Sequence, residues 1–235
     1  MTAGHGGGAL AVPPPRSRGR RRAPRKLDAL AVARLAAIAC LAAGAGFLLY
    51  TAYRIWDPGA HNAQRLMTAK LHQEWTREPA GPPPPITLQA GQPFATIRIP
   101  AFGASWQFSI VEGTTLQQLA TGPGHVTGTA LPGTPGNFAV AAHDITAGNP
   151  FLHLGSLRSG DAVIIQDADG TYQYAVTSEK VVHYTDTAVI YPVPGRPAVP
   201  PTKQYLTLIT CTPVTLDFTP WRIVVSGKLV KSTLK

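Results

Sequence analysis

From residue 94 onward, apolar and polar residues alternate over short runs, which is the pattern of half-buried β-strands. Such runs cover residues 94–99, 105–110, 137–143, 161–166, 171–178, 204–211 and 221–230. Residues 167–170, Asp-Ala-Asp-Gly, have the composition of a hairpin turn between two of these runs. Helical spacing is limited to residues 114–120 and 151–157. Because strands and helices do not alternate regularly, the pattern predicts an all-β fold, a closed antiparallel or mixed barrel with short helices.

Residues 35–53 form a different kind of run, without any charge between Arg34 and Arg54. As a helix this run spans about 28 Å, close to the hydrocarbon thickness of a bilayer, so we expect a transmembrane helix. Eight basic residues precede it and three lie in the twenty residues after it, which places the N-terminus in the cytoplasm. A cleavable secretory signal is the alternative. The small residues Ala43-Gly44-Ala45 lie inside the apolar run rather than after it, which favours a retained signal anchor.

The predicted anchor divides the chain into segments. Residues 1–34 are rich in Gly, Pro and Arg and are expected to form a disordered, basic cytoplasmic tail. Residues 54–85 are expected to form a juxtamembrane helix and a Pro-rich stalk, and residues 86–235 an extracellular domain with a substantial core. Helical spacing predicts one apolar face on the juxtamembrane helix, made of Ala63, Leu66, Met67, Leu71 and Trp75.

The net charge of +9 is concentrated in the tail. Residues 1–34 hold eight basic residues and one acidic residue, whereas residues 86–235 hold nine basic and eight acidic residues. A nearly neutral domain lacks the basic field that phosphate binding requires, so nucleic acid is excluded as a partner. The basic run instead indicates membrane topology, with the lipid bilayer as its partner.

Two cysteines lie on different sides of the predicted membrane boundary. Cys40 is in the anchor and Cys211 in the exported domain, so they cannot form a disulfide within one chain. Cys211 and His143 each end a predicted strand, and Arg222 lies in the strand after Cys211. A single Cys with a distant His at strand ends indicates nucleophilic acyl transfer. The alternatives are a buried structural cysteine and a surface arginine without a role.

Short motifs surround these residues. Residues 207–211 read Thr-Leu-Ile-Thr-Cys, residues 122–125 read Gly-Pro-Gly-His, and residues 131–138 read Leu-Pro-Gly-Thr-Pro-Gly-Asn-Phe and lead into His143. With the ordered His, Cys and Arg and the anchor, they resemble the sortases, membrane-anchored cysteine transpeptidases of Gram-positive cell envelopes, over about residues 96–230. The details are most similar to class E, housekeeping-type sortases. The resemblance implies a closed sortase-type β-barrel behind an N-terminal transmembrane helix.

The resemblance also implies catalytic roles. Cys211 would be the nucleophile, held as a thiolate by Arg222 and a protonated His143. His143 would protonate the leaving amine and deprotonate the incoming one, with His125 as the alternative base. Arg222 would hold the substrate backbone and stabilise the oxyanion. Alternation turns Thr210 away from the face of Cys211, which favours backbone placement as its role. The residues expected at the substrate are Thr210, Ile209, His125 and Tyr191.

The implied reaction is cleavage of a C-terminal LPXTG or LAXTG sorting motif between Thr and Gly, with transfer to an amine. The implied partners are secreted proteins bearing that motif and a peptidoglycan precursor amine.

No cofactor is expected. No metal is expected either, because zinc-ligand spacing is missing and the Pro-rich loop 185–203 holds one carboxylate, Asp186. That loop is instead expected to shape the substrate groove, with residues 191–194 as a wall. Residues 79–85 lack a lid motif, which favours anchoring over pilus polymerisation.

One departure from the family pattern is Asp144, where many relatives have Arg after the His. Asp144 either stabilises an imidazolium on His143 by its charge or serves as a turn residue, and the turn is favoured.

Two other functions of the chain remain open. A sortase-like barrel without catalysis would be a membrane-tethered binding protein. An L,D-transpeptidase is disfavoured, because residues 209–213 lack the Ser-x-Gly-Cys-x-Arg context of that class.

Overall fold

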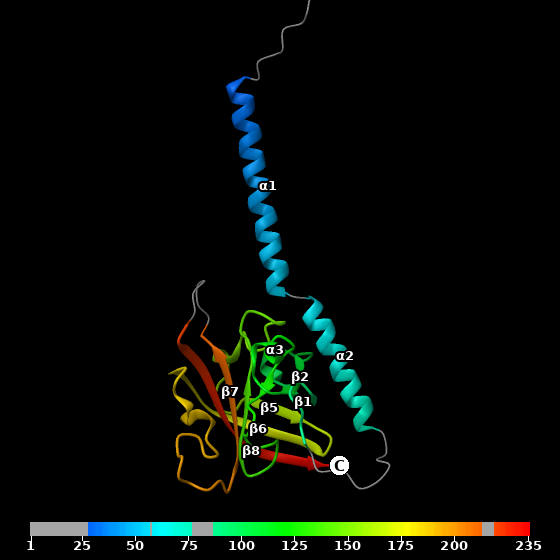
Figure 1. Ribbon diagram of the computed structural model, residues 1–235, viewed down its shortest axis with the longest axis vertical. Coiled ribbons are helices and arrows are strands. Elements are labelled where there is room, and N and C mark those ends of the chain that lie inside the picture. Colours follow the sequence, from blue (N-terminus) through cyan, green and yellow to red (C-terminus); the bar gives the residue numbers. More distant parts are fainter. Residues whose placement is uncertain (1–27, 57, 77–86, 213–218) are drawn as a thin grey trace, which may run out of the picture. The chain divides into compact units, whose positions relative to one another are not determined.

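The computed structural model describes residues 28–56, 58–76, 87–212 and 219–235 (Figure 1). The predicted tail and the Pro-rich segment at 79–85 lie outside these residues, apart from the end of the tail. The strands are β1 (Pro93–Arg98), β2 (Gln107–Glu112), β3 (Gly124–His125), β4 (Gly136–Ala141), β5 (Ala162–Gln166), β6 (Gly170–His183), β7 (Gln204–Cys211) and β8 (Trp221–Leu234). The helices are α1 (Ala29–Trp56), α2 (Pro58–Trp75) and α3 (Leu116–Leu119), with 3₁₀ turns η1 (Pro100–Phe102), η2 (Leu154–Ser156) and η3 (Thr187–Ile190).

The strands close into a barrel in the order β1-β2-β3-β4-β7-β8-β6-β5, which confirms the predicted fold class. The pairs β2–β3 and β4–β7 are parallel, and the remaining pairs are antiparallel. Parallel strands need a long crossover. Between β4 and β7 the crossover carries η2, β5, β6 and η3, so segments far apart in the chain meet at the β4–β7 seam.

Apolar side chains from all sides of the barrel fill its interior. They include Ile97, Phe108, Ile110, Phe138, Val140, Val163, Ile165, Tyr174, Leu206, Leu208 and Val225. Because successive side chains of a strand point to opposite faces, Leu206 and Leu208 in the core turn Ile209 and Cys211 toward the outer face of β7. The alternation of apolar and polar residues along β7 thus determines that the Cys211 thiol lies on the outer face of the sheet.

The hairpin between β5 and β6 forms where the sequence predicts it. Asp167 Oδ1 accepts hydrogen bonds from the backbone N–H groups of Asp169 and Gly170, at 2.9 and 3.0 Å. A side chain that caps its own turn in this way explains the Asp-x-Asp-Gly composition. The strand that follows is longer than predicted, because β6 continues to His183 in pairing with β8. The predicted helices at 114–120 and 151–157 are the short elements α3 and η2.

The helix α1 contains one stretch, Ala29–Tyr53, that is long and apolar enough to cross a membrane, with a mean hydropathy of 2.0. No second such helix occurs in the described residues. Its side chains are not buried by the protein. A helix of this length and apolar composition agrees with the predicted membrane segment.

Helix α2 packs on the barrel through polar contacts. Gln64 is only 2% exposed, and its Oε1 accepts a hydrogen bond from the Ser109 N–H at 2.7 Å. Its Nε2 donates to the carbonyl of Thr121. Thr68 Oγ1 lies 2.8 Å from Ser109 Oγ. The amide of Gln64 therefore joins the helix both to β2 and to the segment after α3.

The predicted apolar face of this helix is wrong at two positions. Leu66 is 65% exposed and Ala63 is exposed, whereas Leu71 and Gln64 are buried. Hydrophobic spacing does not find the buried face of α2, because that face is centred on the amide of Gln64 rather than on an apolar side chain. A polar side chain suits this position because the backbone groups that it meets need hydrogen-bond partners.

Replacing Gln64 by Leu should lower the free energy of unfolding by about 1–3 kcal/mol, because the buried Ser109 N–H and the Thr121 carbonyl lose their partner. The full-length protein in detergent micelles would be unfolded with denaturant. The matched control is Gln73→Leu at an exposed position of the same helix, which should change stability by less than about 0.5 kcal/mol. Equal effects of the two substitutions would contradict the role given to Gln64.

Candidate active site

The parallel seam between β4 and β7 brings His143 and Cys211 together. In this seam Ala141 pairs with Ile209. Two contacts continue it beyond β4: the Ala142 N–H donates to the Ile209 carbonyl at 3.0 Å, and Thr210 Oγ1 donates to the Ala142 carbonyl at 2.8 Å. The same register, continued by two residues, places His143 level with Cys211. His143, two residues after β4, is thus brought near Cys211 at the end of β7, although the two are 68 positions apart in sequence.

Arg222 reaches the same site from the other side of β7. Cys211 and Arg222 are direct partners in the antiparallel pairing of β7 with β8, so both side chains are on one face of the sheet. The guanidinium Nη1 donates to the carbonyl of Thr219 at 2.7 Å and to that of Trp221 at 2.9 Å. These contacts hold the cation near the thiol, where its charge acts on Cys211. The order β4-β7-β8 therefore produces a row of imidazole, thiol and guanidinium.

The protonation of this row is set first by burial. Burial lowers the pKa of His143, and the charge of Asp144 partly offsets this. Burial likewise raises the pKa of Cys211; Arg222 lowers it and Asp144 raises it further. A raised thiol pKa and a lowered imidazole pKa both favour neutral side chains at neutral pH. These directions run against a resting thiolate beside a protonated His143, because burial outweighs the attraction of Arg222 at the thiol. The expectation itself stays a prediction.

Asp144 combines both of the roles considered for it. Its side chain is 6% exposed, and its Oδ1 accepts a hydrogen bond from the Ile145 N–H at 2.9 Å, as a turn residue does. Its charge also raises the pKa of His143 and that of Cys211. The turn holds this carboxylate where it acts on both groups.

A pocket of about 190 Å³ lies on the outer face of the sheet beside Arg222. Its lining residues are Val126, Val182, His183, Tyr184, Asp186, Thr187, Val189, Ile190, Ile209, Arg222 and Val224. Ile209 is thus placed at the pocket, two residues before Cys211 on the same face. The loop before β7 forms one wall, but through residues 186–190 rather than the predicted 191–194. Tyr191 is not a lining residue, because the turn η3 directs Val189 and Ile190 toward the sheet.

Thr210 lies outside the pocket. Its side chain is buried, and its hydroxyl is bonded to the Ala142 carbonyl, one residue before His143. The assignment of Thr210 to substrate binding is corrected by this contact. Thr210 instead holds the end of β4 against β7, which is the backbone placement that strand alternation favours.

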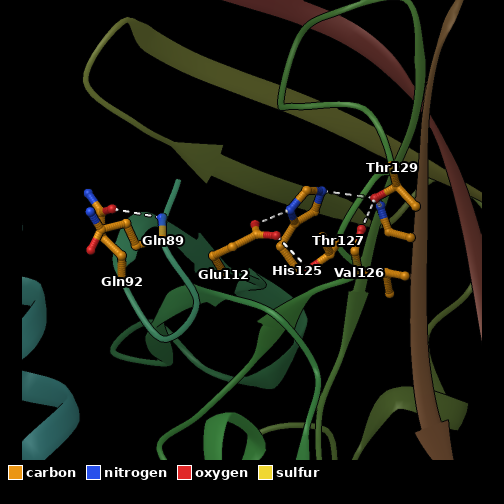
Figure 2. Close-up of polar contacts among 8 residues, drawn as sticks. Gln89, Gln92, Glu112, His125, Val126, Thr127 and Thr129 are labelled. Atoms are coloured by element: carbon orange, nitrogen blue, oxygen red, sulfur yellow. Dashed lines mark hydrogen bonds and ion pairs between the residues drawn. The ribbon is translucent and has the colours of Figure 1, made fainter. Parts of the chain in front are cut away.

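His125 is also placed away from the pocket, in a buried polar network (Figure 2). Its Nδ1 lies 2.6 Å from Glu112 Oε2, and its Nε2 lies 2.9 Å from Thr129 Oγ1. Thr127 donates to the other oxygen of Glu112 at 2.6 Å. The ring stacks on Phe138 at a centroid distance of 5.2 Å.

His125 is 3% exposed and both ring nitrogens have partners within the protein. This placement disfavours its predicted roles as a substrate-binding residue and as the alternative base. The neighbouring Val126 lines the pocket instead. The pocket is also lined by Val182, His183, Thr187 and Val189, which the sequence did not indicate. Val182 and Val189 have the local pattern of core residues, and no motif marks His183 or Thr187.

Metal ligands do not gather at the site. Within the described residues, no group of three or more His, Cys, Asp or Glu side chains is arranged to hold a metal ion. The chemistry available in the row is that of a thiol, an imidazole and a guanidinium.

Comparisons with known proteins agree on the family. A family model for the sortase domain matches residues 97–230. Sortase SrtE1 of Streptomyces coelicolor is 30% identical over 199 residues, which cover 80% of this chain and 54% of SrtE1. Sortase SrtE2 of the same organism is 28% identical over 92% of this chain and 88% of its own length. The structure of sortase E from Streptomyces avermitilis superposes with a TM-score of 0.56 and 37% identity, over 62% of this chain and 93% of that one. The chain thus spans about half the length of SrtE1.

Replacing Arg222 by Ala should slow alkylation of Cys211 by iodoacetamide several-fold at neutral pH. The reason is that Arg222 lowers the pKa of the thiol, and only the thiolate reacts. The rate would be measured against pH by mass spectrometry of the Cys211 peptide from the full-length protein in detergent. Arg196→Ala, at an exposed loop position, is the matched control and should leave the rate unchanged. An unchanged rate in Arg222→Ala would refute the coupling.

Proposed function

The chain belongs to the sortase family, and we propose that it is a class E-like, membrane-anchored cysteine transpeptidase. It cleaves a C-terminal LPXTG or LAXTG sorting motif between Thr and Gly and transfers the protein to a cell-wall precursor amine. The row of His143, which follows β4, with Cys211 on β7 and Arg222 on β8 carries this proposal. We infer that helix α1 is the anchor, and the excess of basic residues before it supports an orientation with the barrel outside the cell.

The reaction begins with a proton transfer inside the row. The Cys211 thiol gives its proton to His143, and the resulting thiolate attacks the carbonyl carbon of the motif Thr. The oxyanion of the tetrahedral intermediate develops where the guanidinium of Arg222 stabilises its charge. The C–N bond to Gly then breaks, the leaving amine takes the proton from His143, and a thioester remains on Cys211.

The second half of the reaction reverses these steps, with the acceptor amine in place of the glycine amine. The acceptor amine loses a proton to His143 and attacks the thioester carbonyl, so that an amide forms and the Cys211 sulfur leaves. The sulfur recovers its proton from the imidazole. Because His143 serves as acid in one half and base in the other, a neutral resting pair suits both directions.

The pocket beside Arg222 is proposed to receive the part of the motif that precedes the Thr. Ile209, Val189 and Ile190 give it an apolar lining, which suits the Leu side chain of either motif. The second motif residue, Pro or Ala, distinguishes the two substrate classes.

We expect the full-length protein in detergent to cleave fluorogenic LPXTG or LAXTG peptides in the presence of a glycine-type amine. Cys211→Ala and His143→Ala should each lower kcat by at least about a hundredfold, since each removes a group that acts in bond breaking. Cys40→Ala, the same change at a cysteine outside the site, should retain full activity.

The covalent step has its own readout. A short incubation without acceptor should leave a thioester adduct on Cys211, detected by intact mass and removed by hydroxylamine. Peptide binding without any adduct would indicate a tethered binding protein on an inactive barrel and would overturn the proposal.

The pH dependence of kcat/KM should be a broad bell. Catalysis requires one proton shared by the pair, so activity falls below the lowered pKa of His143 and above the raised pKa of Cys211. Asp144→Asn keeps an acceptor for the Ile145 N–H and removes the charge that raises both pKa values. Both limbs should therefore move to lower pH in this variant. A limb that moves to higher pH would contradict the assignment.

A further inference from the structure

Two buried polar residues, Asn137 and Thr207, take no part in the chemistry described above. Asn137 is 1% exposed on β4, and Thr207 is fully buried on β7. In the parallel seam Thr207 pairs with Ala139 and Asn137 with Tyr205, so the two polar side chains are close neighbours. Thr207 Oγ1 donates to Asn137 Oδ1 at 2.9 Å.

Both side chains also reach the loop that precedes β7. Asn137 Nδ2 donates to the carbonyl of Val189 at 3.0 Å and to that of Tyr191 at 3.1 Å. The Thr207 hydroxyl lies 3.2 Å from the same Val189 carbonyl. An amide and a hydroxyl together thus satisfy the polar groups of one turn of the loop.

This turn is the wall of the pocket. Val189 and Ile190 line it from the loop, and Ile209 and Arg222 line it from the sheet. The ends of the loop are fixed by backbone contacts, from the Tyr184 N–H to the Pro220 carbonyl at 2.7 Å and from the Gly136 N–H to the Lys203 carbonyl at 3.0 Å. The middle of the loop is tied to the barrel by the hydrogen bonds of Asn137 and Thr207.

We propose that Asn137 and Thr207 are positioning residues that hold the 186–190 wall at the distance from β7 at which the peptide substrate binds. They touch neither the substrate nor Cys211; they act through the carbonyls of Val189 and Tyr191. The inference rests on the proposed peptide substrate. Because a buried carbonyl without a partner is costly, the wall has one stable position as long as both donors are present.

The test compares Thr207→Val with Thr207→Ser in the full-length protein in detergent. Val has the shape of Thr without the hydroxyl, whereas Ser keeps the donor. Thr207→Val should raise KM for the preferred peptide about tenfold, the equivalent of one lost buried hydrogen bond, with kcat within about twofold. Thr207→Ser should restore KM to within about twofold of the original protein. Alkylation of Cys211 by iodoacetamide should be unchanged in both variants.

Asn137→Asp provides a second, independent variant. It keeps the shape of the side chain but replaces the donors to two carbonyls by an acceptor, so it should raise KM further than Thr207→Val. The matched control is Thr177→Val, which makes the same change at an exposed position of β6 and should leave KM unchanged. An unchanged KM in Thr207→Val, or a loss of kcat with slower alkylation, would overturn the proposal.

Hydrogen exchange separates this inference from the proposed function. Amides of fragment 186–196 should exchange faster in Thr207→Val than in Thr207→Ser, while fragment 162–176 is unchanged. This readout needs no substrate. If exchange is faster in Thr207→Val but the original protein cleaves no peptide, the proposed function is refuted and the positioning role of Asn137 and Thr207 is retained. If exchange is unchanged in Thr207→Val and the original protein cleaves the peptide normally, only the positioning role is refuted.

Discussion

The parallel pairing of β4 with β7 is the constraint on which the candidate site depends. Cys211 ends β7 and His143 follows the end of β4, and these two ends meet because Ala141 is in register with Ile209. Beyond the last strand pair, the Thr210 hydroxyl continues the seam to the Ala142 carbonyl. A shift of one residue would turn every side chain of β7 to the other face, and the thiol would point into the core. The same seam carries Asn137 and Thr207, which reach the pocket wall.

Burial then determines the chemistry that this geometry can perform. Burial removes the hydration that stabilises the charged forms of the thiol and the imidazole. It therefore raises the pKa of Cys211 and lowers the pKa of His143, and both shifts favour the neutral forms. Arg222 opposes the shift at the thiol, and Asp144 opposes it at the imidazole. For the proposed reaction, these directions favour a pair that shares one proton over a permanently charged nucleophile. A group that must act in turn as acid and base is suited to such a pair.

Polar residues inside the molecule hold the elements that surround the site. Gln64 ties α2 to β2, Glu112 joins His125 and Thr127, and Asn137 ties the loop before β7 to the seam. In each case a buried side chain satisfies groups that would otherwise be unpaired. Such contacts specify one arrangement, because an apolar side chain of the same size leaves backbone groups without partners.

The sequence alone determined the barrel class, the apolar helix near the N-terminus and the three chemical groups, because period-2 alternation and uncharged length are local properties. Strand alternation also indicated that Thr210 turns away from the face of Cys211. Only the tertiary structure decided that His125 is enclosed, that Gln64 rather than Leu66 faces the barrel, and that Val189 and Ile190 rather than Tyr191 form the pocket wall. The physical reason is that burial and hydrogen-bond partners depend on residues distant in the chain. A histidine or an amide has the same local pattern whether its partners are protein groups or substrate.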